Sequence, residues 1–243
     1  MNAKVKICGL RTPEALEAAL DAGADYFGLV FYGPSPRNVD HETAHELAEA
    51  GRGRARSVAL LVNPDDDAVR RVVDEVDPDI IQLHGNESPE RVAQIKQIAQ
   101  KPVMKAITVG SADDVAQARV YDGAADIILY DAKAPDDLAD ALPGGNGVPF
   151  DWKALRDVKG RGSFMLSGGL NPDNVASAIA ATGAAIVDVS SGVESAPVPP
   201  RISCQVAAEQ AQPSHAQPVV ASAHHIKGSE RGLEDHCRPA LAG

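Results

Sequence analysis

Short apolar segments rich in β-branched residues recur between helix-like segments along most of this chain. Regular alternation of this kind means parallel strands joined by right-handed helical crossovers. Eight such units predict an α/β protein with a closed (β/α)8 barrel, the TIM barrel, rather than an open doubly wound sheet, and no GxGxxG motif follows the first strand. The predicted strands are Lys4–Cys8, Asp25–Phe31, Ser57–Val62, Asp79–Leu83, Pro102–Ile107, Asp126–Tyr130, Ser163–Leu166 and Ala185–Val189.

Four predicted helices begin with one repeated motif: a capping residue, then proline, then an acid. Thr12-Pro13-Glu14, Asn63-Pro64-Asp65, Ser88-Pro89-Glu90 and Asn171-Pro172-Asp173 all follow it. The capping oxygen accepts a hydrogen bond from a free N–H group of the first turn, and the acid lies at the positive end of the helix dipole. We therefore expect a helix to start at each motif.

Composition narrows the class of partner. The net charge of -11 argues against nucleic acid or an anionic membrane surface, because phosphate groups require clustered Lys and Arg. No apolar run is long enough to span a bilayer, no apolar signal core precedes the first strand, and three cysteines make no disulfide framework. We expect a soluble cytoplasmic protein whose partner is a small molecule, present as a monomer or a homodimer.

Two glycine-rich turns follow the last two predicted strands, Ser167-Gly168-Gly169-Leu170 and Ser190-Ser191-Gly192-Val193. Unhindered backbone N–H groups and a helix N-terminus converging at such turns suit a phosphate dianion. We assign phosphate binding to Gly168, Gly169, Ser190, Ser191 and Gly192. Two long loops, 32–40 and 132–151, also follow strand ends, which in a barrel is the catalytic rim.

Two residues at strand ends carry groups suited to proton transfer. Cys8 ends the first strand, where a thiolate could act as base or nucleophile if nearby cations or N–H groups lowered its pKa; otherwise it is a small buried hydrophobe. Asp131 ends the sixth strand, where a partly desolvated carboxyl group could donate a proton, or simply cap the strand or pair with Lys133. On one barrel mouth the two would face each other as base and acid.

Four further polar residues are assigned to substrate binding. Arg37, in a loop stiffened by two prolines, suits bidentate contact with a carboxylate. Gln82 and His84 end the fourth strand on one side, where they contact substrate or complete a hydrogen-bond network. Asp188 lies within an apolar strand, so its charge needs a partner, either a bound hydroxyl or a cation.

Motifs at the ends of the predicted strands occur in this order: Lys6-Ile7-Cys8-Gly9, Ser35-Pro36-Arg37, Gln82-Leu83-His84-Gly85, Asp131, Gly144-Gly145-Asn146-Gly147 before Phe150-Asp151-Trp152, Ser167-Gly168-Gly169-Leu170, and Asp188-Val189-Ser190-Ser191-Gly192-Val193-Glu194. Each is weak alone, but the ordered set is specific. Over about residues 3–197 the chain resembles the phosphoribosylanthranilate isomerase family of tryptophan biosynthesis.

The resemblance implies an Amadori rearrangement of N-(5'-phosphoribosyl)anthranilate to 1-(2-carboxyphenylamino)-1-deoxyribulose 5-phosphate, with no metal or organic cofactor. Asp131 would protonate the furanose ring oxygen and open the ring to a Schiff base. Cys8 would remove the proton on ribose C2 to give an enolamine that becomes the ketone. Arg37 would bind the anthranilate carboxylate, and Asp188 would contact the substrate near the reacting centre.

The C-terminal part departs from the family. Its members continue from Gly192-Val193-Glu194 into an eighth helix, whereas 198–243 is polar, rich in Gln, Ser, His and Ala, and without an obvious match. We expect a catalytic barrel over 1–197 with an atypical or missing eighth helix, and a tail over 198–243 that is poorly ordered or forms one short helix. A metal site at the Cys and His residues of this tail is an alternative, but their spacing fits no standard zinc pattern and favours a disordered polar segment.

Two other interpretations stay open. One is a different phosphosugar barrel: the isomerase of histidine biosynthesis uses two aspartates at the corresponding strand ends, a decarboxylase is a further candidate, and an aldolase needs a strand lysine. Lys105 is the only good candidate on the fifth strand for that lysine, and we expect it to face a carboxylate or the core edge. The other is a catalytically impaired barrel that acts only as a binding module.

Overall fold

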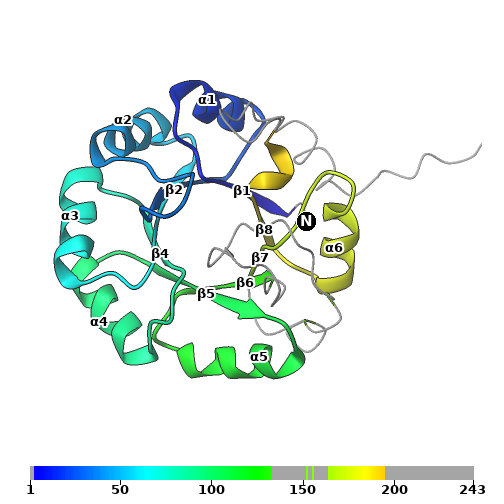
Figure 1. Cartoon of the computed structure of the whole chain (residues 1–243). Helices are drawn as coiled ribbons and strands as arrows, with labels where there is room; N and C mark the ends of the chain where they lie inside the picture. Colours follow the sequence, from blue (N-terminus) through cyan, green and yellow to red (C-terminus); the bar gives the residue numbers. More distant parts are fainter. Residues whose placement is uncertain (1–2, 133–151, 153–154, 156–163, 195–243) are drawn as a thin grey trace, which may run out of the picture.

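The computed structural model describes residues 3–132, 152, 155 and 164–194, and every structural statement below refers to them. Parallel strands form a closed barrel in chain order, and β8 pairs with β1 (Figure 1). The predicted barrel is confirmed, with each strand in the expected segment. The strands are β1 Lys4–Cys8, β2 Tyr26–Phe31, β3 Arg56–Leu61, β4 Ile80–Leu83, β5 Val103–Val109, β6 Ile127–Ala132, β7 Met165–Leu166 and β8 Ile186–Val189.

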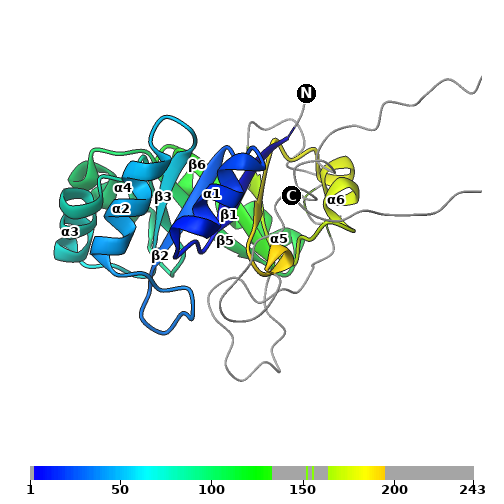
Figure 2. The same cartoon turned by 90° about the horizontal axis from the view of Figure 1, so that it is seen from above.

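Helices surround the barrel and run between successive strands (Figures 1 and 2). They are α1 Pro13–Asp21, α2 His41–Gly51, α3 Asp66–Val76, α4 Pro89–Ala99, α5 Ala112–Gln117 and α6 Val175–Thr182, with 3-10 turns η1 Ala118–Tyr121 and η3 Ser191–Val193. The predictions of an atypical or missing eighth helix and of a poorly ordered 198–243 tail, and the long loop after β6, concern residues outside the described ones.

The capping motifs predict two helix starts correctly and two incorrectly. Thr12 caps α1 and Ser88 caps α4, each accepting from the N–H three residues on. Asn63 instead takes a left-handed conformation, φ 46°, and Asp65 caps α3. The fourth motif forms a turn, because the Asn171 side chain accepts from the N–H groups of residues 173 and 174, so α6 begins only at Val175.

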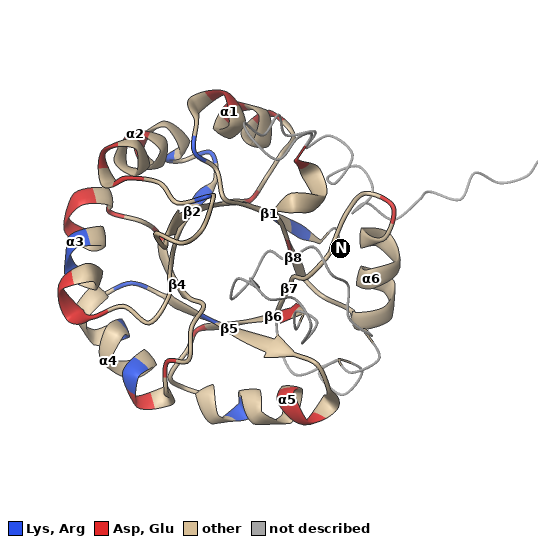
Figure 3. Ribbon diagram, viewed as in Figure 1, with Lys and Arg blue, Asp and Glu red and all other residues tan. Residues whose placement is uncertain are grey.

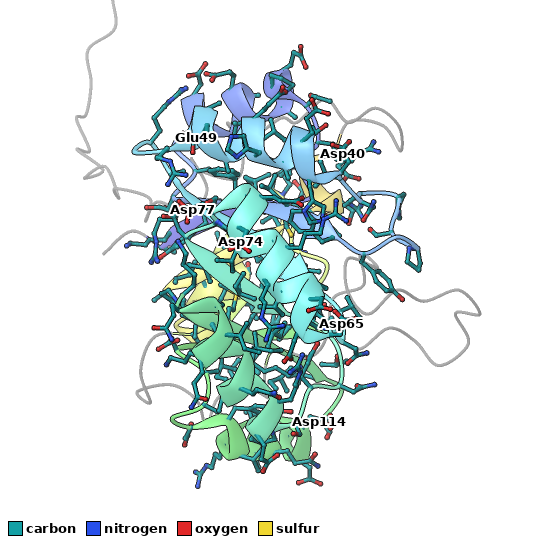
Figure 4. All side chains as sticks on the ribbon, turned by 90° about the vertical axis from the view of Figure 1, so that its left-hand side faces the viewer. Asp40, Glu49, Asp65, Asp74, Asp77 and Asp114 are labelled. Carbon is teal, nitrogen blue, oxygen red and sulfur yellow. The ribbon has the colours of Figure 1, made fainter. Side chains whose placement is uncertain are left out.

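Acidic caps mark the end of the barrel at which the helices begin. Asp40 and Asp65 accept from first-turn N–H groups of α2 and α3, and Asp114 accepts from the N–H of Ser111 before α5. Figure 4 shows these three at one end of the barrel, with Glu49, Asp74 and Asp77 toward the other. Since each helix follows a strand, the capped end is where the strands finish, and this end is the rim that carries active sites in such barrels.

The barrel interior has an apolar layer below a polar one. The apolar layer takes side chains from seven strands, β2 to β8: Tyr26, Val58, Ile80, Met104, Ala106, Leu129, Met165 and Ile186. Nearer the strand ends lie buried polar residues, among them Lys6, Gln82, Asp131 and Asp188. Two larger apolar clusters pack the outer face of the sheet against the helices. The apolar base thus excludes water beneath a charged layer that faces the barrel mouth.

The outer helices carry most of the visible charge, with many acids among them (Figure 3). No helix within the described residues is long and apolar enough to cross a membrane.

Candidate active site

Cys8 lies beside a buried ion pair. Lys6 and Asp188 are register partners on β1 and β8, and Lys6 Nζ donates to Asp188 Oδ1 at 2.9 Å, with Lys6 fully buried. Cys8 is two residues beyond Lys6 on the same strand face. A Cβ atom added at Gly28, on the neighbouring β2, would lie 2.7 Å from Cys8 Sγ and 3.2 Å from Lys6 Nζ. The thiol and the ammonium therefore share one niche that glycine leaves open.

The charges in this niche act on one another. Burial raises the pKa of the Cys8 thiol, although Lys6 and Arg37 oppose that shift. Burial alone would lower the pKa of Lys6, but the charges of Asp188 and Cys8 outweigh it and the pKa is raised. The neighbouring cations thus do not lower the thiol pKa below its ordinary value, as the sequence had suggested they could. Lys6 instead offers a fixed positive charge that stabilises the thiolate when it forms.

Asp131 ends a chain of buried hydrogen bonds. His84 Nε2 lies 3.2 Å from Asp131 Oδ2, and Gln82 Nε2 lies 3.3 Å from His84 Nδ1. Gln82 is fully buried, whereas His84 and Asp131 are 8% and 2% exposed. If the Gln82 amide donates to Nδ1, His84 carries its proton on Nε2 and donates to Asp131. The sequence left open whether Gln82 and His84 contact substrate or complete a hydrogen-bond network. The structure shows that they form such a network.

Arg37 pairs with Glu194, a residue far from it in the sequence. Its Nε donates to Glu194 Oε1 at 2.7 Å and its Nη2 to Glu194 Oε2 at 3.0 Å. Its side chain also lies against Gly9, next to Cys8, since a Cβ atom at Gly9 would overlap Arg37 Cδ. The predicted carboxylate-binding arginine therefore stands at the rim beside the candidate base, already paired on one edge.

The two glycine-rich turns meet, as expected of one phosphate site. A Cβ atom at Gly192 would overlap the carbonyl oxygen of Leu170, and one at Gly168 would overlap Ala132, next to Asp131. Gly168 and Gly169 both have positive φ, 94° and 62°. The helix that follows the first turn begins later than expected, at Val175, and η3 begins within the second turn, at Ser191.

Lys105 forms a buried ion pair with Glu87. Its Nζ donates to Glu87 Oε2 at 2.8 Å and to the Gly85 carbonyl oxygen at 2.7 Å, and both charged side chains are buried. The prediction that it faces a carboxylate is confirmed. The pair fixes the loop directly after His84, and it leaves Lys105 without the free amine that an aldolase requires.

Sequence reasoning missed three charged residues: Lys6, Glu87 and Glu194. A signal existed for Lys6, a lysine in an apolar strand two positions before Cys8 and hence on the same face. Glu194 closes the last motif of the resemblance but was given no role there, and Glu87 lies in a loop outside the motifs. Among the described residues, no group of three His, Cys, Asp or Glu side chains is arranged to hold a metal ion.

Similar proteins carry the same barrel. The model of the family described as N-(5'phosphoribosyl)anthranilate (PRA) isomerase matches residues 5–198. The N-(5'-phosphoribosyl)anthranilate isomerase of Rhizobium rhizogenes is 51% identical over 197 residues, which cover 81% of this chain and 88% of that protein. The crystal structure of phosphoribosyl anthranilate isomerase from Thermotoga maritima superimposes with a TM-score of 0.77 at 33% identity, covering 86% of this chain and 98% of that one.

A second solved structure is a phosphoribosyl anthranilate isomerase in complex with reduced 1-(o-carboxyphenylamino)-1-deoxyribulose 5-phosphate. Its TM-score is 0.74 at 31% identity, with 86% of this chain and 98% of that chain covered. The closed parallel barrel of this chain agrees with these matches. This chain belongs to the N-(5'-phosphoribosyl)anthranilate isomerase family.

Proposed function

We propose that Asp131 and Cys8 carry out the Amadori rearrangement of N-(5'-phosphoribosyl)anthranilate in this isomerase of tryptophan biosynthesis. The observation that carries the assignment is the placement of a carboxyl group and a thiol at the strand ends of one barrel mouth, each supported by its own buried polar partners.

Asp131 donates a proton to the furanose ring oxygen, the bond from that oxygen to C1 breaks, and a protonated Schiff base forms. The Cys8 thiolate takes the proton from C2, and the electron pair of that bond gives the enolamine. Proton transfer from the C2 hydroxyl to C1 completes the ketone, and transfer of a proton from the Cys8 thiol to the Asp131 carboxylate through solvent restores both groups. His84 stabilises the Asp131 carboxylate left after the first step, and Lys6 stabilises the Cys8 thiolate.

The remaining residues hold the substrate. Arg37 binds the anthranilate carboxylate, Asp188 contacts the sugar near the reacting carbons, and the Gln82–His84 chain borders the same space. Backbone N–H groups of the two glycine-rich turns bind the phosphate: Gly168, Gly169, Ser190, Ser191 and Gly192. No step requires a metal or an organic cofactor, so activity should survive exhaustive dialysis against a chelator.

The test is a fluorescence assay of phosphoribosylanthranilate turnover with the purified full-length protein. Cys8→Ser and Asp131→Asn should each bind the reduced product analogue but lose most of kcat, since a hydroxyl is too weak a base at neutral pH and an amide cannot donate the required proton. Cys204→Ser and Asp126→Asn are the matched controls and should turn over normally. Near wild-type kcat in either catalytic variant would refute the acid–base assignment.

The remaining proposals concern the oligomeric state, the cellular compartment, the type of partner and the domain organisation of this chain. A solved Thermotoga maritima relative is described as monomers generated from a dimeric enzyme, and we propose that this chain acts in the cytoplasm as a monomer or homodimer on a phosphorylated small molecule, without a nucleic-acid partner. We also propose a catalytic barrel over 1–197 followed by a separate tail over 198–243. Light scattering of the full chain, and activity after deletion of the tail, test these statements.

A further inference from the structure

We propose that Glu194 is a positioning residue that fixes Arg37 for substrate recognition and connects the carboxylate-binding site to the phosphate-binding turn. The proposal rests on the proposed function, in which Arg37 binds the anthranilate carboxylate. It assigns a role to an acid that stands where a negatively charged substrate group approaches.

The pairing occupies one particular edge of the guanidinium. Glu194 accepts from Nε and Nη2, at 2.7 and 3.0 Å, in a side-on bidentate contact. A guanidinium has five N–H donors, so three remain: two on Nη1 and one on Nη2. One N–H of Nη1 and the remaining N–H of Nη2 point along the outer end of the group, where a second carboxylate can again be bound by two parallel hydrogen bonds. The substrate carboxylate is therefore bound end-on.

Arg37 is restrained along its whole length. Its backbone N–H donates to Ser35 Oγ at 3.2 Å, and its aliphatic stem lies on Gly9, which has φ 91° and no Cβ atom to displace it. Both Arg37 and Glu194 keep 16% of their side chains exposed, so the pair is largely shielded from solvent. Fixing a long side chain before binding lowers the entropy lost when the ligand is bound.

Glu194 also belongs to the phosphate-binding segment. It directly follows η3, and its N–H donates to the carbonyl oxygen of Ser191 at 3.3 Å, next to the N–H of Val193 donating to Ser190. One continuous segment therefore carries the phosphate-binding N–H groups and the acid that fixes Arg37. The distance between the sites for the two ends of the substrate is set by this segment.

The negative charge of Glu194 has a consequence for selectivity. It neutralises Arg37, so the pair offers directed hydrogen bonds rather than a net positive charge to an anion. Removing the charge while keeping the side-chain shape frees Arg37 to rotate and to bind anions less selectively. The affinity of the variant for the substrate should then depend less on the ring carboxylate and its position.

The experiment measures binding of the reduced product analogue with and without its ring carboxylate, by calorimetric titration of the full chain. The ratio of the two dissociation constants is the discrimination factor. Glu194→Gln should lower this factor roughly tenfold or more, as expected when hydrogen bonds to a charged group lose their geometry, and should raise KM more than it lowers kcat. Glu17→Gln, which removes the acid paired with Arg54 on the outer surface, is the matched control and should leave the factor unchanged.

The possible outcomes separate the two proposals. If the wild type binds the analogues with and without the ring carboxylate equally well, Arg37 does not bind that carboxylate, and the proposed role of Glu194 is wrong too. If wild type discriminates and Glu194→Gln discriminates equally, Glu194 does not position Arg37, although the proposed function stands. Glu194→Gln introduced into Arg37→Ala should change the factor no further, and an additional loss there would show that Glu194 acts by another route. Equal melting temperatures of wild type and Glu194→Gln exclude misfolding as the cause.

Discussion

Replacing Lys6 with Met should destabilise the barrel far more than an ordinary substitution of similar size. Met retains most of the aliphatic stem but removes the ammonium, so Asp188 keeps a negative charge with no ion-pair partner at 6% exposure. Removing one partner of a buried ion pair costs about 3–5 kcal/mol. Since whole domains are stable by about 5–15 kcal/mol, that loss is a large share of the total.

The same reasoning predicts that a second substitution repairs the first. In Lys6→Met/Asp188→Asn the buried charge is gone as well, and a buried neutral amide that lacks a partner costs about 1–3 kcal/mol, less than an unpaired buried charge. The double variant should therefore be more stable than Lys6→Met alone. Asp188→Asn alone leaves an unpaired Lys6 ammonium and should be destabilised like the Lys6 variant.

The loss should also depend on pH. Burial raises the pKa of Asp188 and Lys6 opposes that shift, so in Lys6→Met burial and the charge of Asp131 raise the pKa against the weaker effect of His84. The folded form then binds a proton more tightly than the unfolded form, whose carboxyl group titrates near about 3.9. The stability of the variant is therefore highest at or below that pH and falls as the pH rises through the raised folded pKa. The deficit relative to wild type should grow from pH 4 to pH 7.

The assay is urea unfolding followed by circular dichroism, on the wild type and the three variants at several pH values. Trp152, the single tryptophan, packs partly buried against the core and provides a second signal. A deficit below about 1 kcal/mol for Lys6→Met at pH 7, the level of exposed ion pairs, would refute the reasoning. So would a double variant no more stable than Lys6→Met.

Three further outcomes follow from the site. Because burial raises the pKa of Cys8, kcat/KM should increase with pH up to and beyond the ordinary thiol range of about 8.5, as measured by a pH–rate profile. His84→Leu should lower kcat roughly 10- to 100-fold with less effect on KM, because Asp131 loses a hydrogen bond to its charged form. Gly192→Ala should weaken binding of the reduced product analogue roughly tenfold or more, because the new methyl group would overlap the carbonyl oxygen of Leu170.

Each of these has a comparison that can contradict it. A pH–rate profile that is flat between pH 6 and 9 would show that Cys8 is not the titrating base. Unchanged kcat in His84→Leu would mean that Asp131 works without the imidazole. Gly33→Ala is the control for Gly192→Ala, because a Cβ atom at Gly33 meets no other atom within 4 Å. Equal affinity of the two glycine variants for the reduced product analogue would show that the turn at Gly192 does not bind the phosphate.

Local sequence was a good guide to the elements and a partial guide to their ends. Apolar periodicity placed every strand, because a buried parallel strand needs a short apolar run whatever surrounds it. Caps were predicted correctly where one side chain could satisfy the helix start, as at Thr12 and Ser88. They were predicted incorrectly where two neighbouring side chains compete, as at Asn63 and Asp65, because the observed turn geometry decides which of them reaches the free N–H groups.

By itself the sequence determined that Cys8, Asp131 and both glycine turns come at the ends of strands, and parallel strands carry such ends to one rim. Only the tertiary structure decided which charges meet there. Lys6 and Asp188 lie 182 residues apart in the chain, Arg37 and Glu194 157 apart, and His84 and Asp131 47 apart. Closure of the barrel between β8 and β1 brings the first pair into register, and burial then raises the pKa of the thiol beside it. These contacts depend on strand register and on the exclusion of water, which arise only when the whole barrel has closed.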